Sequence, residues 1–355
     1  MLHRFETCVA AVLARGRSNH IFLLAEESDR CVMKVTFPRW PGSVDTDERR
    51  PEISDLIMTQ LLQQRFGFPF LVPTRCSFHV PLEEARQFVL GFHPAHFNLC
   101  HHRRMRADLF VTFDSARWRE RGKIAGKILC MDRKIRFAEK QLQRFSQSLH
   151  KGGGEHALVS LVEYAQHGSL SSFLWEHADE VETWRILIFQ VLYALAVIQQ
   201  SIPSFRHNDL HAANVLVAAV QSRVVEYTVL PDHVFSCQNQ GLEIRLWDFD
   251  CACAEELVPP NYKVAAARSA SFGISAVPNH YYDMHTFCNH LLLYHRPVPA
   301  AVEDFLLDAV PIGFRHGKER FGRLGVGESC DLSPANVLCS HPFFAPLRRS
   351  QGDRH

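Results

Sequence analysis

The segment from residue 205 to residue 251 constrains this chain more than any other. It contains Asp209, Asn214 five residues later, and Asp248, each next to a short apolar run that favours a β-strand. An aspartate can receive the proton of a hydroxyl group, while an asparagine and a second aspartate supply the oxygen ligands that Mg²⁺ prefers. Phosphoryl transfer needs these groups together, so the segment predicts a site for that chemistry.

Composition limits the other classes of function. With 355 residues and 46% hydrophobic residues, the chain can bury a large core in one two-lobed unit or in two domains. A formal net charge of +1 gives no global electrostatic case for a nucleic acid or a membrane as partner. The longest apolar stretch, residues 186–198, is too short to span a bilayer. Eleven cysteines without a CxxC pair indicate reduced thiols, and we expect an intracellular protein without a secretory leader.

The order of predicted elements is strands first and helices later. Hydrophobic periodicity predicts strands over 8–37 with a hairpin turn at 27–29, helices over 51–64, 170–175 and 182–200, and strands over 157–164, 215–217 and 243–247. Residues from 278 onward are predicted to be mostly helical. The basic stretch 82–156, which ends in a glycine linker, is interpreted as an insertion between strands. This order indicates an α+β fold.

Three motifs in this order carry a family resemblance. His207-Asn208-Asp209 resembles the His-Arg-Asp of the eukaryotic-type protein kinase superfamily, and Asp248-Phe249-Asp250 resembles its Asp-Phe-Gly. Cys31-Val32-Met33-Lys34 is similar to Val-Ala-Ile-Lys. Within the superfamily, the chain most resembles divergent serine/threonine protein kinases of large DNA viruses. The resemblance implies a two-lobed fold with an antiparallel-sheet N-lobe over 1–165, a mainly helical C-lobe over 166–345 and a polar tail over 346–355.

The resemblance also implies roles for individual residues. Asp209 would be the catalytic base, and Asn214 and Asp248 would bind Mg²⁺. Lys34 would pair with the α- and β-phosphates of ATP. Glu52 is the best candidate for the carboxylate partner of that lysine, with Glu48 and Asp55 as alternatives within one helical turn.

Three further segments agree with the resemblance. Residues 161–165 and the following Gly-Ser-Leu are similar to the hinge, where the backbone at Glu163 and Ala165 would hydrogen-bond adenine. Asp283 lies where the family's central helix accepts hydrogen bonds from the backbone of the catalytic loop. Residues 332–344 resemble the closing helix and its trailing His-Pro-aromatic segment.

The chain departs from the family at four places. The glycine-rich loop, residues 14–21, keeps only its central glycine, Gly16. Asp250 replaces a glycine, and we favour a turn-capping role for it over a third metal ligand. His211, counted with Asp209 and Lys34 among the candidate catalytic residues, replaces a lysine that is directed at the transferred phosphate. The Ala-Pro-Glu motif is missing at 270–272 and the activation threonine is missing near Ala265, so we expect no control by phosphorylation at that site.

These features lead to one function and two alternatives. The leading prediction is an ATP- and Mg²⁺-dependent kinase that phosphorylates serine or threonine in protein substrates, in the cytoplasm or nucleus of a host cell or in the virion. His211 and Asp250 suggest a small-molecule kinase of the aminoglycoside or choline type as an alternative. The degenerate glycine loop suggests a pseudokinase binding module as the other. No specific nucleic-acid binding and no membrane association are expected.

Overall fold

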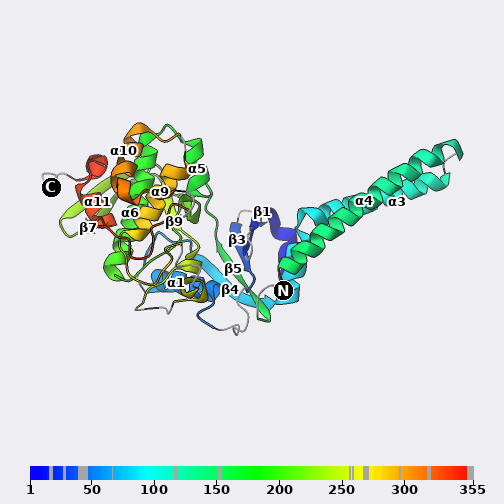
Figure 1. Ribbon diagram of the computed structural model, residues 1–355, viewed down its shortest axis with the longest axis horizontal. Coiled ribbons are helices and arrows are strands. Elements are labelled where there is room, and N and C mark those ends of the chain that lie inside the picture. The colour runs from blue at the N-terminus through cyan, green and yellow to red at the C-terminus, as the bar shows by residue number, and fades with distance from the viewer. Residues whose placement is uncertain are drawn as a thin grey trace. The chain divides into compact units, whose positions relative to one another are not determined.

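The chain forms two compact units in the computed structural model (Figure 1). The structure describes residues 1–15, 19–26, 29–38, 47–65, 67–115, 118–149, 154–255, 257, 260–266, 272–295, 297–317 and 321–349. Unit 1 comprises residues 1–45 and 75–162, and unit 2 comprises residues 46–74 and 163–355. Strands and long helices together confirm the predicted α+β class.

Unit 1 is built on a five-stranded sheet with the order β1-β2-β3-β5-β4. The strands are β1 (Val9–Arg15), β2 (Asn19–Glu26), β3 (Asp29–Thr36), β4 (Thr74–Pro81) and β5 (His156–Glu163), preceded by a 3-10 helix, η1 (Leu2–Cys8). β2 pairs antiparallel with β1 and β3, and the pair Glu26 with Asp29 confirms the predicted hairpin. One face of the sheet buries Phe22, Met33 and Val159 in a common apolar core.

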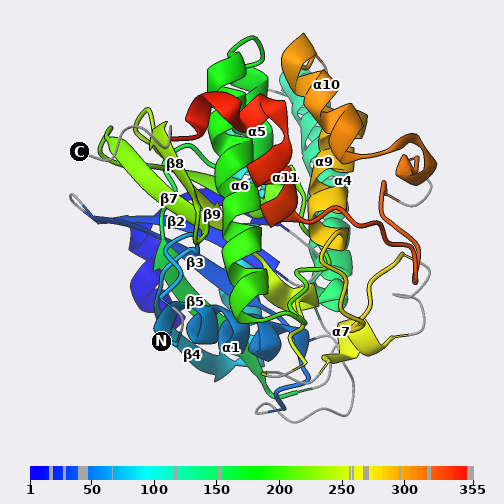
Figure 2. The ribbon, with the colours of Figure 1, turned by 90° about the vertical axis from the view of Figure 1, so that its left-hand side faces the viewer.

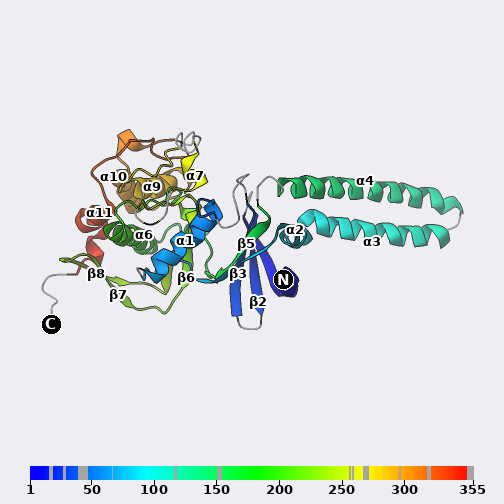
Figure 3. The ribbon, with the colours of Figure 1, turned by 90° about the horizontal axis from the view of Figure 1, so that it is seen from below.

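The predicted insertion is helical. It contains α2 (Leu82–Gly91), α3 (Pro94–Ser115) and α4 (Trp118–Ser148), between β4 and β5. α3 and α4 lie side by side and antiparallel (Figure 3). Ion pairs join Arg103 to Glu139 and Arg106 to Asp132 across this hairpin. The end of α4 returns to the sheet, where Leu149 is buried in the core of unit 1.

Unit 2 is mainly helical and packs around α6 (Val181–Ser201), with α11 and α9 beside it (Figure 2). Its other helices are α1 (Pro51–Gln64), α5 (Leu170–Glu176), α7 (Tyr262–Ala265), α9 (Tyr282–Tyr294), α10 (Ala300–Ala309) and α11 (Pro334–Ser340). Its short helices of the 3-10 type are η2 (Ala212–Asn214), η3 (Phe249–Cys251), η4 (Ile312–Phe314) and η6 (Pro342–Leu347). Two antiparallel pairs complete it: β6 (Val215–Ala219) with β9 (Leu242–Leu246), and β7 (Val224–Leu230) with β8 (His233–Gln238).

α6 is apolar around most of its circumference because unit 2 surrounds it. Its polar residue Gln190 is buried, and its amide is matched by the edge of β9: Nε2 donates to the Leu242 carbonyl at 3.2 Å, and Oε1 accepts from the Ile244 N–H at 2.9 Å. The helix has the length and hydropathy of a membrane span, but 72% of its most apolar window is buried inside the protein. It therefore serves as the core helix of unit 2.

α1 forms over the predicted residues. Proline at its first position has the fixed φ of a helix, and Glu52 in the first turn interacts favourably with the helix dipole. The segment 46–74 belongs to unit 2 because α1 and the residues before it are tied to later parts of the chain: the Tyr262 N–H donates to the Arg49 carbonyl at 2.8 Å, and the Phe249 N–H donates to Asp55 Oδ1 at 2.8 Å.

Candidate phosphoryl-transfer site

The register of two strands places two of the predicted Mg²⁺ ligands. β6 and β9 pair so that Val215 lies opposite Leu246. The ladder continues one residue further, where the Trp247 N–H donates to the Asn214 carbonyl at 3.0 Å. Asn214 and Asp248 therefore come from neighbouring ends of the same two-stranded ladder. Apolar residues that alternate on both strands fix this register, because a shift by one residue would expose the buried Val215 and Ile244.

The loop that carries Asp209 is held from below by Asp283 on α9. The backbone N–H groups of His207 and Asn208 donate to its two carboxylate oxygens at 2.7 and 2.9 Å. Asp283 is fully buried, and this burial raises the pKa of its carboxyl group, whereas the two hydrogen bonds act in the opposite direction. The predicted backbone contact of Asp283 is confirmed.

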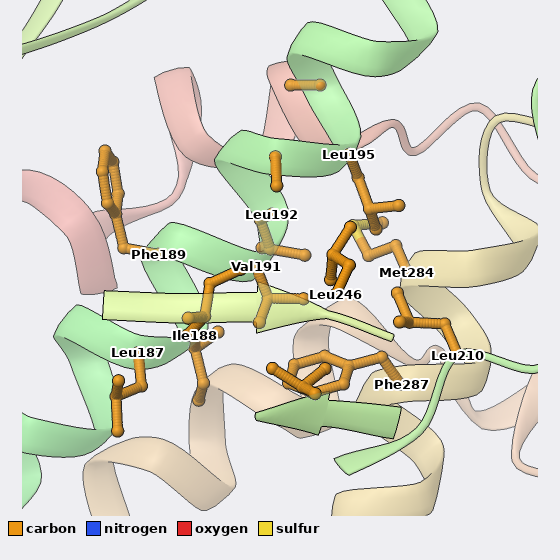
Figure 4. Close-up of a cluster of buried hydrophobic side chains, with 14 of the residues drawn as sticks. Leu187, Ile188, Phe189, Val191, Leu192, Leu195, Leu210, Leu246, Met284 and Phe287 are labelled. Atoms are coloured by element: carbon orange, nitrogen blue, oxygen red, sulfur yellow. The ribbon is translucent and has the colours of Figure 1, made fainter. Parts of the chain in front are cut away.

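Core packing and backbone strain also fix this loop. Leu210 points into the apolar cluster formed by α6, β9 and α9, near Leu246 and Met284 (Figure 4). Asn208 adopts a left-handed conformation with φ of 63°, and its Nδ2 donates to the carbonyls of Cys251 and Ser275 at 3.0 Å each. Side-chain bonds of this kind offset the cost of a left-handed backbone in a residue other than glycine.

Three side chains approach Asp209. Asn214 Nδ2 donates to the Asp209 carbonyl at 2.9 Å, which fixes the amide plane of Asn214. His211 Nε2 lies 3.7 Å from Asp209 Oδ1. Arg323 forms an ion pair and a hydrogen bond with the same carboxylate oxygen. Sequence reasoning missed Arg323, because it lies more than one hundred residues after Asp209 in a segment without a recognisable motif.

Asp248 is held by the residues on either side of it. It adopts a left-handed conformation with φ of 65° and ψ of 67°, a strained backbone that is typical of functional sites. On one side, His207 Nε2 lies 3.1 Å from the Trp247 carbonyl. On the other side, the Phe249 ring lies 4.9 Å from the His207 ring, and the backbone N–H of Phe249 donates to the Asp55 carboxylate. The strain at Asp248 is thus balanced by contacts from two separate segments, those of His207 and Asp55.

Asp250 lies in η3 and forms an ion pair with a lysine side chain. Its Oδ1 accepts a hydrogen bond from Lys263 Nζ at 2.5 Å, and its backbone carbonyl accepts one from Asn261 Nδ2 at 3.1 Å. Asn261 in turn caps α7, since its Oδ1 accepts from the N–H groups of Lys263 and Val264. Asp250 therefore joins η3 to α7 through Lys263, a contact that neither of the two sequence hypotheses for this residue included.

The remaining predicted residues belong to other elements. Lys34 is on β3 of unit 1, opposite Ile21, and is buried. Glu52, on α1 of unit 2, forms a buried ion pair with Arg50 in which Nη2 lies 2.5 Å from Oε1. The pairing of Lys34 with Glu52 stays a prediction. Gly16 lies outside the described residues.

The predicted hinge lies at the end of β5. The Glu163 N–H donates to the Pro73 carbonyl at 2.9 Å, and the Ala165 carbonyl accepts from the Gly168 N–H at 3.1 Å. These bonds fix the backbone of this segment. The role of Glu163 and Ala165 in binding adenine stays a prediction.

Burial controls the charge of the histidine and cysteine side chains around the site. Burial lowers the pKa of His211 below its usual value, although the Asp209 carboxylate acts in the opposite direction. His211 stacks on His290, at 5.1 Å between ring centroids, and burial lowers the pKa of His290 to about 3. Both imidazoles are therefore neutral at pH 7. Burial raises the pKa of Cys253 to about 11, so this thiol is not a thiolate nucleophile.

The donor set fits Mg²⁺ better than a transition metal. Asn214 and Asp248 offer amide and carboxylate oxygens, which are hard ligands. Within the described ranges, no group of three or more His, Cys, Asp or Glu could hold a metal by itself. A site with one carboxylate and one amide suits an ion that takes its other ligands from phosphate oxygens and water.

Comparison with known proteins gives one similarity that bears on function. No family model matches the sequence. A protein of Acanthamoeba polyphaga mimivirus named "Putative serine/threonine-protein kinase R400" is 33% identical over 227 residues, which cover 59% of this chain and 48% of that protein. The chain thus spans about half the length of the curated relative that it matches. This similarity supports a relationship to kinases.

Proposed function

We propose that the chain is an ATP- and Mg²⁺-dependent protein kinase with the two-lobed kinase fold, which transfers the γ-phosphate to serine or threonine hydroxyls. The observation that carries the proposal is the arrangement around Asp209. Its loop is fixed by Asp283, Asn214 is oriented by a hydrogen bond to the Asp209 carbonyl, and Asp248 follows on the paired strand. The named function of the mimivirus relative supports the same conclusion.

In the proposed reaction, Asp209 accepts the proton of the acceptor hydroxyl as its oxygen bonds to the γ-phosphorus. The bond between the γ-phosphorus and the oxygen that bridges to the β-phosphate breaks, and ADP leaves. Asn214 and Asp248 would hold Mg²⁺, and the ion would supply charge neutralisation at the phosphate oxygens. Lys34 binds the α- and β-phosphates, and the backbone at Glu163 and Ala165 binds adenine. Positioning and charge neutralisation supply most of the rate enhancement.

The proposed substrates are proteins inside a host cell. The family resemblance of the closing segment, together with Asp283 beneath the catalytic loop, supports a protein acceptor over a small molecule. A neutral His211 beside Asp209 supports the small-molecule alternative, because that position then lacks the positive charge of a protein kinase lysine.

The test is transfer of labelled γ-phosphate from ATP in the presence of Mg²⁺. The acceptors are a generic basic protein, the chain itself, and a panel of aminoglycosides and amino alcohols. We expect Mg²⁺-dependent phosphoserine or phosphothreonine on protein. Transfer to the small molecules alone would replace the protein substrate in the proposal, and saturable ATP binding without transfer to any acceptor would favour the binding-module alternative.

A further inference from the structure

A cation from a distant segment reaches the candidate base. Arg323 lies in the segment 321–324 and forms an ion pair with Asp209 Oδ1. The side chains of the pair are largely buried, with 14% of Arg323 and 20% of Asp209 exposed. A contact at this degree of burial is screened less by solvent than a surface ion pair. How well its geometry is defined depends on how firmly each partner is held.

The segment that carries Arg323 is held firmly against α9. Asn289 Nδ2 donates to the Gly322 carbonyl at 2.7 Å and to the His316 carbonyl at 2.9 Å. Gly322 has φ of +70°, and a Cβ there would lie 2.7 Å from Leu293 Cδ1 and 3.1 Å from Asn289 Nδ2. Glycine suits this position because another residue would be strained at this φ and its Cβ would crowd the Leu293 and Asn289 side chains.

The residues on both sides of Arg323 are also fixed. Leu324 is fully buried, and its carbonyl oxygen lies so close to Gly273 that a Cβ there would be at 1.8 Å. The Phe321 ring packs on the Phe272 ring, at 5.6 Å between centroids. The backbone on either side of Arg323 is thus anchored, which directs the guanidinium to Asp209.

Arg323 also brings a positive charge to Asp209. His211, the nearer residue in sequence, lies 3.7 Å from the same carboxylate oxygen and stacks on the His290 ring, at 5.1 Å between centroids. An arginine stays protonated at any pH at which proteins are folded. Its guanidinium has five N–H donors in a fork that matches carboxylate and phosphate oxygens together.

We propose that Arg323 is a catalytic residue that binds the transferred phosphoryl group and provides a positive charge from the C-terminal part of unit 2. One Nη2–H group holds the Asp209 carboxylate in place to receive the hydroxyl proton. The other donors of the fork bind the γ-phosphate oxygens as charge moves onto the β–γ bridging oxygen. This inference rests on the proposed kinase activity.

The experiment compares wild type with Arg323→Gln, His211→Lys and the double variant Arg323→Gln/His211→Lys. Arg349→Gln is the matched control, because Arg349 pairs with Glu226 at an exposed site on β7. The measurements are kcat for γ-phosphate transfer, the Kd of ADP with Mg²⁺, and the melting temperature. ADP lacks the γ-phosphate, so its affinity reports on the fold and on nucleotide binding without the group that Arg323 is proposed to bind.

We expect Arg323→Gln to lower kcat about 100-fold, because the loss of one donor from a preorganised anion site has an effect of this size. The Kd of ADP should change less than about threefold. His211→Lys should restore at least about tenfold of that loss by returning a cation next to Asp209. Arg349→Gln should match wild type.

Three results would overturn the proposal. Unchanged kcat in Arg323→Gln would remove Arg323 from the reaction, and a higher kcat would make the ion pair an inhibitory contact. If Arg323→Gln lost both transfer and ADP binding, and the added His211→Lys substitution restored neither, Arg323 would have a structural role. An inactive wild type that binds ATP would instead contradict the proposed kinase activity itself.

Discussion

Asp283 shows how one buried carboxylate can set the position of another. It carries no solvent-exposed surface, and it receives two backbone N–H bonds from the loop whose next residue is Asp209. Hydrogen bonds to a charged acceptor are stronger than neutral ones, and leaving those two amides without a partner would cost their desolvation energy. The placement of Asp209 therefore depends on a residue that does not need to touch a substrate.

Buried histidines make the stability of the protein depend on pH. His285 is fully buried, with Nε2 2.7 Å from the Phe314 carbonyl, and burial lowers its pKa to about 4. In the unfolded chain this histidine binds a proton near pH 6.5. Its contribution to the stability of the folded state is therefore present above that pH and is lost as pH falls towards 4. Between pH 7 and pH 5, this one residue should lower the free energy of unfolding by about 2 kcal/mol.

Urea unfolding at the two pH values tests this residue. The variant His285→Gln keeps a donor near the position of Nε2 but cannot titrate. Between pH 7 and pH 5, we expect its free energy of unfolding to fall by about 2 kcal/mol less than that of wild type. His233→Gln, at an exposed position on β8, is the matched control and should behave as wild type. Equal pH dependence in wild type and His285→Gln would show that His285 is not held neutral by burial.

At the scale of elements, α1 acts as the support of the segment 247–251. Asp55 in its second turn caps the Phe249 N–H, and Ser54 lies 3.3 Å from the amide of Asn261, which follows η3. A movement of α1 would therefore displace the strained residue Asp248. The sequence left Asp55 only as an alternative partner for Lys34, whereas the structure gives it this backbone contact.

We predict that Asp55→Ala lowers the rate of phosphate transfer about tenfold or more, because a small displacement of a metal ligand is costly in a preorganised site. Asp55→Asn keeps an oxygen acceptor at the same place and should retain most of the activity. The measurement is kcat at saturating ATP over a range of Mg²⁺ concentrations, in which Asp55→Ala should need more Mg²⁺. Equal loss in both variants would mean that the negative charge matters and the capping bond does not.

At the scale of the whole molecule, the sequence predicted elements better than contacts. Periodicity located α1 and α6 and most strands to within a few residues, since their apolar faces are buried where the pattern indicates. The motifs around Asp209 and Asp248 predicted a site because acidic and amide residues lie at fixed offsets beside short apolar runs and resemble kinase motifs. Arg323 could not be predicted, since a single arginine in an irregular segment has no periodic or local signal.

The helical hairpin of unit 1 was also not readable from the sequence. α3 and α4 are basic and bury little except the strip where they face each other, and α3 is only weakly amphipathic. Near the base of the hairpin, by contrast, the Phe145 ring lies 4.3 Å from His93 and 5.6 Å from His20, and this contact joins α4 to the sheet. The two parts of the hairpin thus differ in what they contribute to unit 1.

We expect the outer part of the hairpin to be dispensable for unit 1. Replacing residues 105–135 by a four-residue Gly-Ser loop removes helices that contact each other and should leave ADP affinity and phosphate transfer within about threefold of wild type. Phe145→Ala, at the base, should instead destabilise unit 1 by about 2 kcal/mol through lost ring packing. Loss of transfer in the shortened protein, with an unchanged melting temperature, would show that the outer hairpin takes part in activity or substrate binding.

The most direct test of the account is phosphate transfer by Asp209→Asn. The control is Asp232→Asn, at an exposed turn between β7 and β8. The account predicts that Asp209→Asn keeps ATP affinity within about threefold but loses about 10³-fold in kcat, because an amide cannot accept the hydroxyl proton. Asp232→Asn should match wild type. Full transfer by Asp209→Asn would contradict the assignment of the catalytic base and, with it, the site described around Asp209.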